Sequence, residues 1–378
     1  MKLVNIVGAR PQFIKLAPLE RAITEFNSGD SRTVESVIIH TGQHYDSGMS
    51  DIFFDQLKIP RAHFHLDVGS GRHGEQTGRM LEKIEDILLD ASPDMVVTYG
   101  DTNSTLAGAL AASKLHIPVA HVEAGLRSFD RRMPEEINRL VADHVSDLLL
   151  APTPTAVTNL GNENLSSRTV FTGDIMYDAV LFNRNLAKQR SAILKKLQLE
   201  PGTFGLVTVH RASNTDEKGR LGKLLQTFNE VAAKQLPLVF PVHPRTANAL
   251  KSEYARWTAH PNLHLVDPLG YLDMLSLLDN AKIALTDSGG LQKEAFFLGC
   301  PCITLREETE WVETVEAGGN RLTGTDPEKI LAAVSHWQQY SASGVLRFSS
   351  EAAQYFGDGH AASAILDTLL QFSGRRAA

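Results

Sequence analysis

The chain has 378 residues and a formal net charge of −7, with 43% hydrophobic and 21% charged residues. The length suggests two domains with a sizeable core, and the composition is ordinary for a soluble globular protein. The net negative charge argues against nucleic acid as the main partner, because phosphate backbones need basic surfaces. A nucleotide remains possible, since it needs only a few local cations.

The N-terminus "MKLVNIVGARPQFIK" has no small-residue cleavage site typical of a secretory signal. No apolar stretch approaches the ~20 residues that span a bilayer, so we expect a cytoplasmic protein without a membrane partner. Cys300 and Cys302 are too few for a disulfide scaffold or a thiolate metal site, and we expect two buried small residues.

Short apolar runs alternate with amphipathic stretches through the first half. The expected strands are Leu3–Val7, Ser36–His40, Met95–Tyr99, Val119–Val122 and Asp147–Leu150. The expected helices are Phe13–Phe26, Gln76–Leu89, Ser104–Leu115 and Glu135–Val145. This alternation predicts a parallel, doubly wound sheet.

The second half repeats the pattern. The expected strands are Phe204–Val209, Leu238–Val242, Leu263–Val266, Ile283–Thr286 and Cys302–Leu305. A long helical pattern from Ile175 to about Leu199 is the expected link, and Ala361–Phe372 is the last expected helix.

We therefore expect an α/β fold of two Rossmann-like doubly wound domains facing a cleft. The expected boundaries are 1–173, joined by a C-terminal helix over 357–378, and 174–356. Ligands of such sheets bind beyond the carboxyl ends of the strands. Functional side chains should therefore follow strands in both halves.

The first strand is followed by "VGARPQFIK", where Gly8 permits a tight turn and Pro11 suits a helix start. Arg10 and Lys15 are then either ligands for an anion at this helix start or ordinary solvated charges.

The second strand is followed by "HTGQHYD". His40, Gln43, His44 and Asp46 make a metal site conceivable, but they stand on a turn and not on a helix that would present two ligands from one face. We expect a polar wall and no metal.

Three carboxylates follow strands or begin a helix in the first half. Asp101 follows a strand in "YGDTNST", Glu123 follows the next in "HVEAG", and Glu135 stands in the first turn after Pro134. Helix capping or the helix dipole would explain Asp101 or Glu135 alone. Gathered at one edge of one sheet, the three suit proton abstraction and donation.

Two strands of the second half end in histidine and arginine, in "TVHR" and "VHPR". His210 and His243 are either polar neighbours of the core or, with their arginines, contacts for a phosphate or oxyanion.

The stretch "TDSGGLQKEAFFLG" follows another strand. Ser288 is the expected N-cap, and Gly289 and Gly290 would let a pyrophosphate approach bare N–H groups. Glu294 stands within reach of an attached ribose. G-x-G-x-x-G and G-x-x-x-x-G-K-[ST] are both missing, so we expect neither NAD nor FAD nor a P-loop.

Eight motifs occur in order between about residues 7 and 325: "GARPQFIK", "TGQHYD", "YGDTNST", "HVEAGLRS", "MPEEINR", "VTVHR", "DSGGLQKEA" and "VEAG". Together they resemble the non-hydrolysing UDP-N-acetylglucosamine 2-epimerases. The resemblance implies a glycosyltransferase-B fold, a UDP-sugar substrate, no cofactor, a homodimer and a role in supplying surface polysaccharide precursors. It also implies a mechanism. The proton on the sugar carbon that bears the acetamido group is removed as UDP leaves, which forms a glycal, and UDP then adds back with a proton delivered from the opposite face.

The resemblance also assigns roles to residues. The implied catalytic group is Asp101, Glu123, Glu135 and His210. The implied substrate-binding group is Arg10, Lys15, Arg139, Ser288, Gly289, Gly290 and Glu294, to which the strand-end reasoning adds His243. Allosteric activation by substrate in some members implies a possible role for Gln43 and His44.

Some motifs depart from the commonest members. "HRAS" has Ser213 where a glutamate is usual, and "TEWVE" has Trp311 and Val312 where arginine and proline are usual. "TEWVE" and "LRSFDRRMPEE" resemble the motifs of a subgroup that epimerises UDP-2,3-diacetamido-2,3-dideoxyglucuronate. The carboxylate of that sugar could be bound by Arg131 and Arg132, which are otherwise solvated charges. This sugar is the alternative substrate, and a UDP-sugar-dependent glycosyltransferase is the more distant alternative function.

Overall fold

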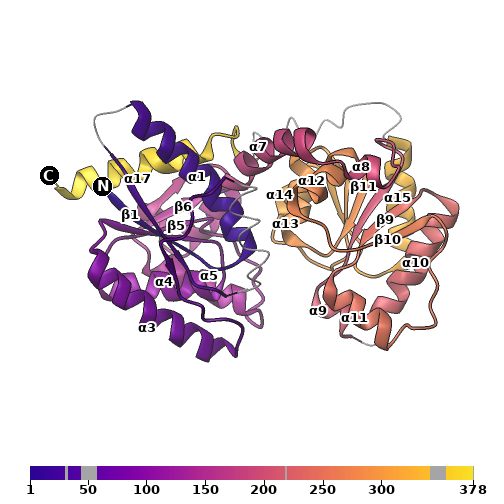
Figure 1. Cartoon of the computed structure of the whole chain (residues 1–378), viewed down its shortest axis with the longest axis horizontal. Helices are drawn as coiled ribbons and strands as arrows, with labels where there is room; N and C mark the ends of the chain where they lie inside the picture. The colour runs from indigo at the N-terminus through magenta and orange to yellow at the C-terminus, as the bar shows by residue number, and fades with distance from the viewer. Residues whose placement is uncertain (30–32, 44–57, 218, 341–354, 378) are drawn as a thin grey trace. The chain divides into compact units, whose positions relative to one another are not determined.

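The computed structural model describes residues 1–29, 33–43, 58–217, 219–340 and 355–377 (Figure 1). The chain divides into two compact units. Unit 1 comprises Met1–Ala179 and Gln354–Ala378, and unit 2 comprises Val180–Ala353. Both chain ends therefore lie in unit 1, as Figure 1 shows.

Unit 1 is built on a parallel sheet with the strand order β3-β2-β1-β4-β5-β6-β7 among the described residues. The strands are β1 Lys2–Val7, β2 Glu35–His40, β3 Phe64–His65, β4 Met95–Tyr99, β5 Val119–Val122, β6 Leu148–Ala151 and β7 Thr169–Phe171. The inner strands β1, β4, β5 and β6 are buried over nearly their whole length, as parallel strands covered on both faces must be.

Helices connect these strands. They are α1 Arg10–Gly29, α3 His73–Ala91, α4 Asn103–Lys114, α5 Pro134–Val145 and α6 Pro154–Asn162. A single 3-10 turn, η1 Ser166–Arg168, precedes β7. The last helix, α17 Ala361–Ala377, packs against α1, so the chain returns to its first unit to complete it (Figure 1).

Unit 2 repeats the plan with the strand order β10-β9-β8-β11-β12-β13, again parallel. The strands are β8 Gly205–Thr208, β9 Leu238–Pro241, β10 Leu263–Val266, β11 Ile283–Thr286, β12 Cys302–Thr304 and β13 Asn320–Leu322. The helices are α9 Ala212–Thr215, α10 Arg220–Lys234, α11 Pro244–Ser252, α12 Tyr271–Asn280, α13 Gly289–Phe297, α14 Val312–Glu316 and α15 Pro327–Tyr340.

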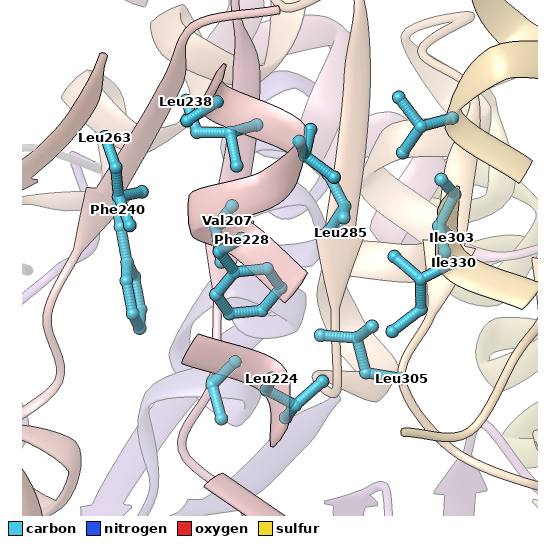
Figure 2. Close-up of a cluster of buried hydrophobic side chains, with 14 of the residues drawn as sticks. Val207, Leu224, Phe228, Leu238, Phe240, Leu263, Leu285, Ile303, Leu305 and Ile330 are labelled. Carbon is cyan, nitrogen blue, oxygen red and sulfur yellow. The ribbon is translucent and has the colours of Figure 1, made fainter. Parts of the chain in front are cut away.

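The core of unit 2 packs α10 and α15 onto one face of this sheet, as Figure 2 shows. Phe228 of α10 meets Phe240 of β9 edge to face, with 5.9 Å between ring centroids. Leu285 and Ile303 continue the buried layer across β11 and β12. The apolar face of α10 is therefore what fixes it on the sheet.

The expected single link helix is wrong in one respect, because two helices occupy its place. α7 spans Ile175–Arg190 and α8 spans Ile193–Lys196. Ser191 lies between them; its hydroxyl accepts the N–H of Ile193 and donates to Asp273. A serine that bonds the backbone and a distant carboxylate competes with helix continuation, which explains the break.

The ten expected strands are confirmed, and none of their ends differs from the expected position by more than one residue. The sequence reasoning missed β3, β7 and β13, which have two or three residues each. A run that short carries no alternation for a pattern to detect.

Each sheet has one point where the chain reverses its direction of strand addition. In unit 1 this is between β1 and β4, and in unit 2 it is between β8 and β11. Ligands of doubly wound sheets bind at such switch points, beyond the carboxyl ends of the strands. The segments that follow these four strands are therefore the first places to look for a site.

Candidate active site

Gln12 ties the two strands of the unit 1 switch point together. Its side-chain oxygen accepts the N–H groups of Gly8 at 2.8 Å and Ala9 at 3.1 Å. Its amide donates to the carbonyl of Tyr99 at 2.8 Å and to the hydroxyl of Thr105 at 3.0 Å. The turn after β1 is thus fixed to the end of β4 before any substrate binds.

Glycine is needed at position 8 because two side chains approach its backbone closely, and its φ is not in the left-handed region. A Cβ there would lie 1.9 Å from Oγ1 of Thr41 and 2.3 Å from Oγ of Ser104, both buried. No larger residue fits at this point.

Lys15 and Glu123 form a buried ion pair. The Nζ–Oε1 distance is 2.5 Å, and the two side chains are 7% and 8% exposed. Glu123 has a φ of 73°, a conformation that costs free energy in a non-glycine residue and marks functional sites. Gly100 makes room for the pair, because a Cβ there would lie 3.0 Å from the lysine Nζ.

A buried network of hydrogen bonds around Asp143 holds the loop that carries Glu123. His121 hydrogen-bonds Asp143 at 2.6 Å and the carbonyl of Gly100 at 2.7 Å, and Arg127 meets the other oxygen of Asp143 at 2.7 Å. Burial works to raise the pKa of Asp143, but the bonds from His121 and Arg127 outweigh it and hold that pKa below its ordinary value. This network was missed from the sequence.

Asp101 follows β4, and Arg139 of α5 pairs with it. Arg139 donates to Asp101 at 2.5 Å and to Glu136 at 2.9 Å. Glu135, a member of the predicted catalytic group, lies four residues before Arg139 on α5. The pair forms with Glu136 instead, and Glu135 is exposed at the start of α5.

Glu136 is buried, and its carboxylate holds the loop that precedes α5; we call it the Glu136 clamp. Its carboxylate accepts the N–H and hydroxyl of Ser128, at 2.9 and 3.0 Å, and the N–H of Phe129 at 3.0 Å. Burial works to raise the pKa of Glu136, but these donors and Arg139 hold it below its ordinary value. Glu136 therefore stays ionised and fixes the loop before α5. It was not among the predicted site residues.

Gln43 has a structural task in the described residues. Its oxygen accepts the N–H of Ser104 at 3.0 Å and the hydroxyl of the same residue at 2.7 Å, which fixes the start of α4. His44 and Asp46 lie outside the described residues. His40 is buried, and its ring stacks on His65 with 5.3 Å between centroids. Arg10 is exposed at the first position of α1.

In unit 2, Asp287 organises the switch point. It is fully buried at the end of β11, and its carboxylate accepts the N–H of His210 at 3.1 Å and of Arg211 at 3.0 Å. It also accepts the amide of Asn214 at 3.1 Å, and its Oδ1 lies 3.3 Å from Nδ1 of His210. Asp287 was missed, although its place directly after an apolar strand was a usable signal.

The surroundings of His210 disfavour the charged form of its imidazole. Burial lowers its pKa below the ordinary 6.5; Asp287 opposes this, and the charges of Arg211 and Arg245 add to it. His243 lies beside it, with 5.4 Å between ring centroids. His243 caps α11 by accepting the N–H of Arg245 at 3.2 Å.

The start of α13 has the predicted features. Ser288 is the N-cap, and its hydroxyl accepts the N–H of Leu291 at 3.4 Å. Gly290 is exposed, and no atom lies within 4 Å of the place a Cβ would take. Glu294 is half-buried on the same helix. The first N–H groups of α13 are therefore open to an anion.

Three polar groups surround the space above Gly289. A Cβ there would lie 3.6 Å from Arg211, 3.7 Å from Glu310 and 3.7 Å from the indole nitrogen of Trp311. Lys293 lies 3.8 Å from the centroid of the Trp311 ring. Arg211 thus brings a cation to the start of α13, and Glu310, which pairs with Arg211 at 3.7 Å, brings a carboxylate to the same place.

The described residues contain no group of three or more His, Cys, Asp or Glu side chains placed to hold a metal ion. Cys300 and Cys302 are buried free thiols, as predicted, and burial raises the pKa of Cys302 to about 12. Among the described residues, every helix is too short or too polar to cross a bilayer.

Comparison with known proteins agrees with this geometry. Residues 28–370 match the family model described as UDP-N-acetylglucosamine 2-epimerase. A UDP-N-acetylglucosamine 2-epimerase homolog of Methanococcus maripaludis is 51% identical over 98% of this chain and 99% of its own length. The UDP-2,3-diacetamido-2,3-dideoxy-D-glucuronate 2-epimerase of Pseudomonas aeruginosa is 46% identical over the same shares.

Solved structures give the same result. The UDP-GlcNAc 2-epimerase of Methanocaldococcus jannaschii in complex with UDP-GlcNAc and UDP is 42% identical, with a TM-score of 0.87 over 98% of this chain and 100% of that one. The fold is therefore the glycosyltransferase-B type predicted from the motifs. The chain belongs to the UDP-N-acetylglucosamine 2-epimerase family, whose members are isomerases.

Proposed function

We propose that this chain is a non-hydrolysing UDP-N-acetylglucosamine 2-epimerase that interconverts UDP-GlcNAc and UDP-ManNAc. The observation that carries the proposal is the pair of carboxylates at the switch point of unit 1. Asp101 follows Gly100 in the chain, Glu123 Oε1 would lie 3.5 Å from a Cβ at Gly100, and each carboxylate is bonded to a cation. A carboxylate held by a cation is fixed in place for proton transfer.

The carboxylates of unit 1 act on the sugar. One takes the proton from C2, whose C–H electron pair becomes the C1=C2 bond as the anomeric C–O bond breaks and UDP leaves with its electron pair. The product is a 2-acetamidoglucal. Return of UDP to C1 with delivery of a proton to the other face of C2 gives the epimer. We assign these proton transfers to Asp101, Glu123 and Glu135.

The groups of unit 2 hold UDP. Ser288, Gly289 and Gly290 present N–H groups to the diphosphate, and Glu294 accepts from the ribose hydroxyls. His210 donates to the departing phosphate oxygen, where negative charge develops as the C–O bond breaks. Neither step needs a cofactor, because no net oxidation occurs.

The test is product analysis with purified protein and UDP-GlcNAc. The proposal expects UDP-ManNAc, reached also from the reverse direction, with the UDP linkage intact. Free sugar and UDP in place of the epimer would indicate a hydrolysing enzyme. Sugar transfer to an added acceptor without epimerisation would indicate a glycosyltransferase.

A second sugar is favoured by one observation. The relative that acts on UDP-2,3-diacetamido-2,3-dideoxyglucuronate shares 46% identity, and this chain has the "TEWVE" and "LRSFDRRMPEE" forms of that subgroup. Arg132 is paired with Asp130 in its own loop at 2.8 Å, whereas Arg131 is exposed and is the cation left for a sugar carboxylate. A ratio of kcat/KM for the two nucleotide sugars decides between them.

The family resemblance also supports a homodimer that works in the cytoplasm on a nucleotide sugar for surface polysaccharide. Light scattering of the purified protein tests the dimer: twice the chain mass is expected, and the single-chain mass would contradict it.

A further inference from the structure

Phe129 combines two unusual properties. Its φ is 58°, in the left-handed region that a bulky L-residue rarely adopts. Its side chain is 77% exposed, more than any other large hydrophobic side chain in the described residues. An exposed aromatic ring on a strained backbone stabilises nothing in the folded chain by itself. Such strain persists where the surroundings impose it, and it concentrates at functional sites.

The surroundings that impose it are identifiable. The buried Glu136 accepts the N–H groups of Ser128 and Phe129, so the backbone on either side of the strained φ is held. Beyond it, Asp130 accepts the backbone N–H of Arg132 at 3.0 Å and its guanidinium at 2.8 Å. The loop before α5 is therefore fixed with its aromatic ring turned out to solvent.

The same clamp reaches the proposed acid/base group. Glu136 also binds Arg139 at 2.9 Å, and Arg139 binds Asp101 at 2.5 Å. Three consecutive contacts thus connect the backbone of Phe129 to the carboxylate of Asp101. The loop that carries the ring is therefore tied to the carboxylate that we assign to proton transfer at C2.

We propose that Phe129 covers the sugar of the bound nucleotide sugar and retains the glycal intermediate. The inference rests on the proposed function and adds to it. The glycal made from UDP-GlcNAc is uncharged, so once the C–O bond has broken it has lost its diphosphate anchor. An aromatic face packs well on the C–H face of a sugar and on the acetamido methyl group. It also keeps water from the intermediate.

The readout is leakage of the intermediate. For each variant, the rate of epimer formation and the rate of release of UDP and 2-acetamidoglucal are measured together by proton NMR. Leakage is the rate of release divided by the rate of epimer formation. Phe129→Ala is expected to raise this ratio on the order of tenfold, the scale of an aromatic contact removed. Phe129→Leu keeps apolar bulk and should leak less than Phe129→Ala. Phe171→Ala, which removes another exposed phenylalanine of unit 1, should match wild type.

Phe129→Gly separates a functional role from a structural one. Glycine adopts a positive φ at little cost, so this variant should melt at the wild-type temperature or ~2 °C higher, yet leak like Phe129→Ala. Leakage equal to wild type in Phe129→Ala and Phe129→Gly would overturn the inference. So would a drop in melting temperature in both, because the ring would then be part of the fold. Wild-type protein that does not epimerise either sugar would instead overturn the proposed function.

Discussion

The ammonium of Lys15 lies 2.5 Å from the carboxylate of Glu123, although 108 residues separate the two along the chain. The pair joins α1 to the end of β5 inside unit 1. Both side chains are buried, so the attraction between the two charges offsets part of the free-energy cost of removing them from water. The resemblance implied that Lys15 faces the substrate, and its observed partner is the proposed acid/base residue.

Lys15→Met should destabilise the protein by ~3–5 kcal/mol, because it leaves the carboxylate of Glu123 buried without its cation. The double variant Lys15→Met/Glu123→Gln should recover most of that loss, since no charge is left unpaired. Lys2→Met removes an exposed pair with Glu35 and should cost less than ~1 kcal/mol. Denaturant unfolding measures all three, and equal losses for Lys15→Met and the double variant would contradict the pairing.

Asp101→Asn should abolish turnover and leave UDP affinity unchanged, because its proposed role is proton transfer. Arg139 keeps its bond to Glu136 in this variant, so the loop before α5 should hold its place. Calorimetry with UDP and a turnover assay give the two numbers. Asp90→Asn on the exposed face of α3 is the matched control and should behave as wild type. Near-normal turnover would remove Asp101 from the mechanism.

Glu294→Ala should weaken UDP binding by ~1–3 kcal/mol, the scale of a lost hydrogen bond to a charged group. The loss should be absent for uracil, which has no ribose. Glu328→Ala, also in unit 2 and exposed at the start of α15, should bind UDP normally. Unchanged UDP affinity in Glu294→Ala would count against the ribose contact.

His40 should make the free energy of unfolding depend on pH. Burial, with the charge of His65 beside it, lowers the pKa of His40 from 6.5 to about 4. The unfolded chain therefore binds a proton at a higher pH than the folded one, and stability falls as pH decreases from about 6.5 to about 4. The loss is on the order of 3 kcal/mol across that window.

His40→Asn tests this dependence, because the amide oxygen can accept the N–H of Gly42 in place of Nδ1 and does not titrate. Unfolding free energies measured between pH 4 and 7 should show a shallower slope than wild type. His116→Asn is the control: this residue is exposed and has a φ of 59°, which asparagine tolerates. A slope unchanged by His40→Asn would assign the pH dependence to other groups.

The sequence was enough to predict which polar residues follow the strands, and too little to predict the contacts that hold them. An apolar run followed by a carboxylate or a serine–glycine pair has a local signature, so the positions of Asp101, Glu123 and Ser288 after strands were predicted. The partners come from distant segments: Arg139 lies 38 residues from Asp101. No local pattern encodes such a pairing, which depends on how α5 packs against α4 and β5.

Glu135 and Glu136 show the same limit. Both stand in the first turn of α5, and the helix dipole favours either. Only the packed structure separates them, with Glu136 buried as a clamp and Glu135 exposed. Phe129 was missed because a positive φ on a bulky residue contradicts local preference, and such exceptions are set by tertiary contacts.

The most direct test of the account is proton NMR of the wild-type enzyme with UDP-GlcNAc in D2O. Elimination and re-addition through a glycal require the C2 proton to leave and a solvent proton to return. The account predicts UDP-ManNAc with deuterium at C2, and gradual deuteration of UDP-GlcNAc itself. Epimer that retains its original C2 proton would contradict the proton-abstraction step, and no epimer from either nucleotide sugar would contradict the proposed function.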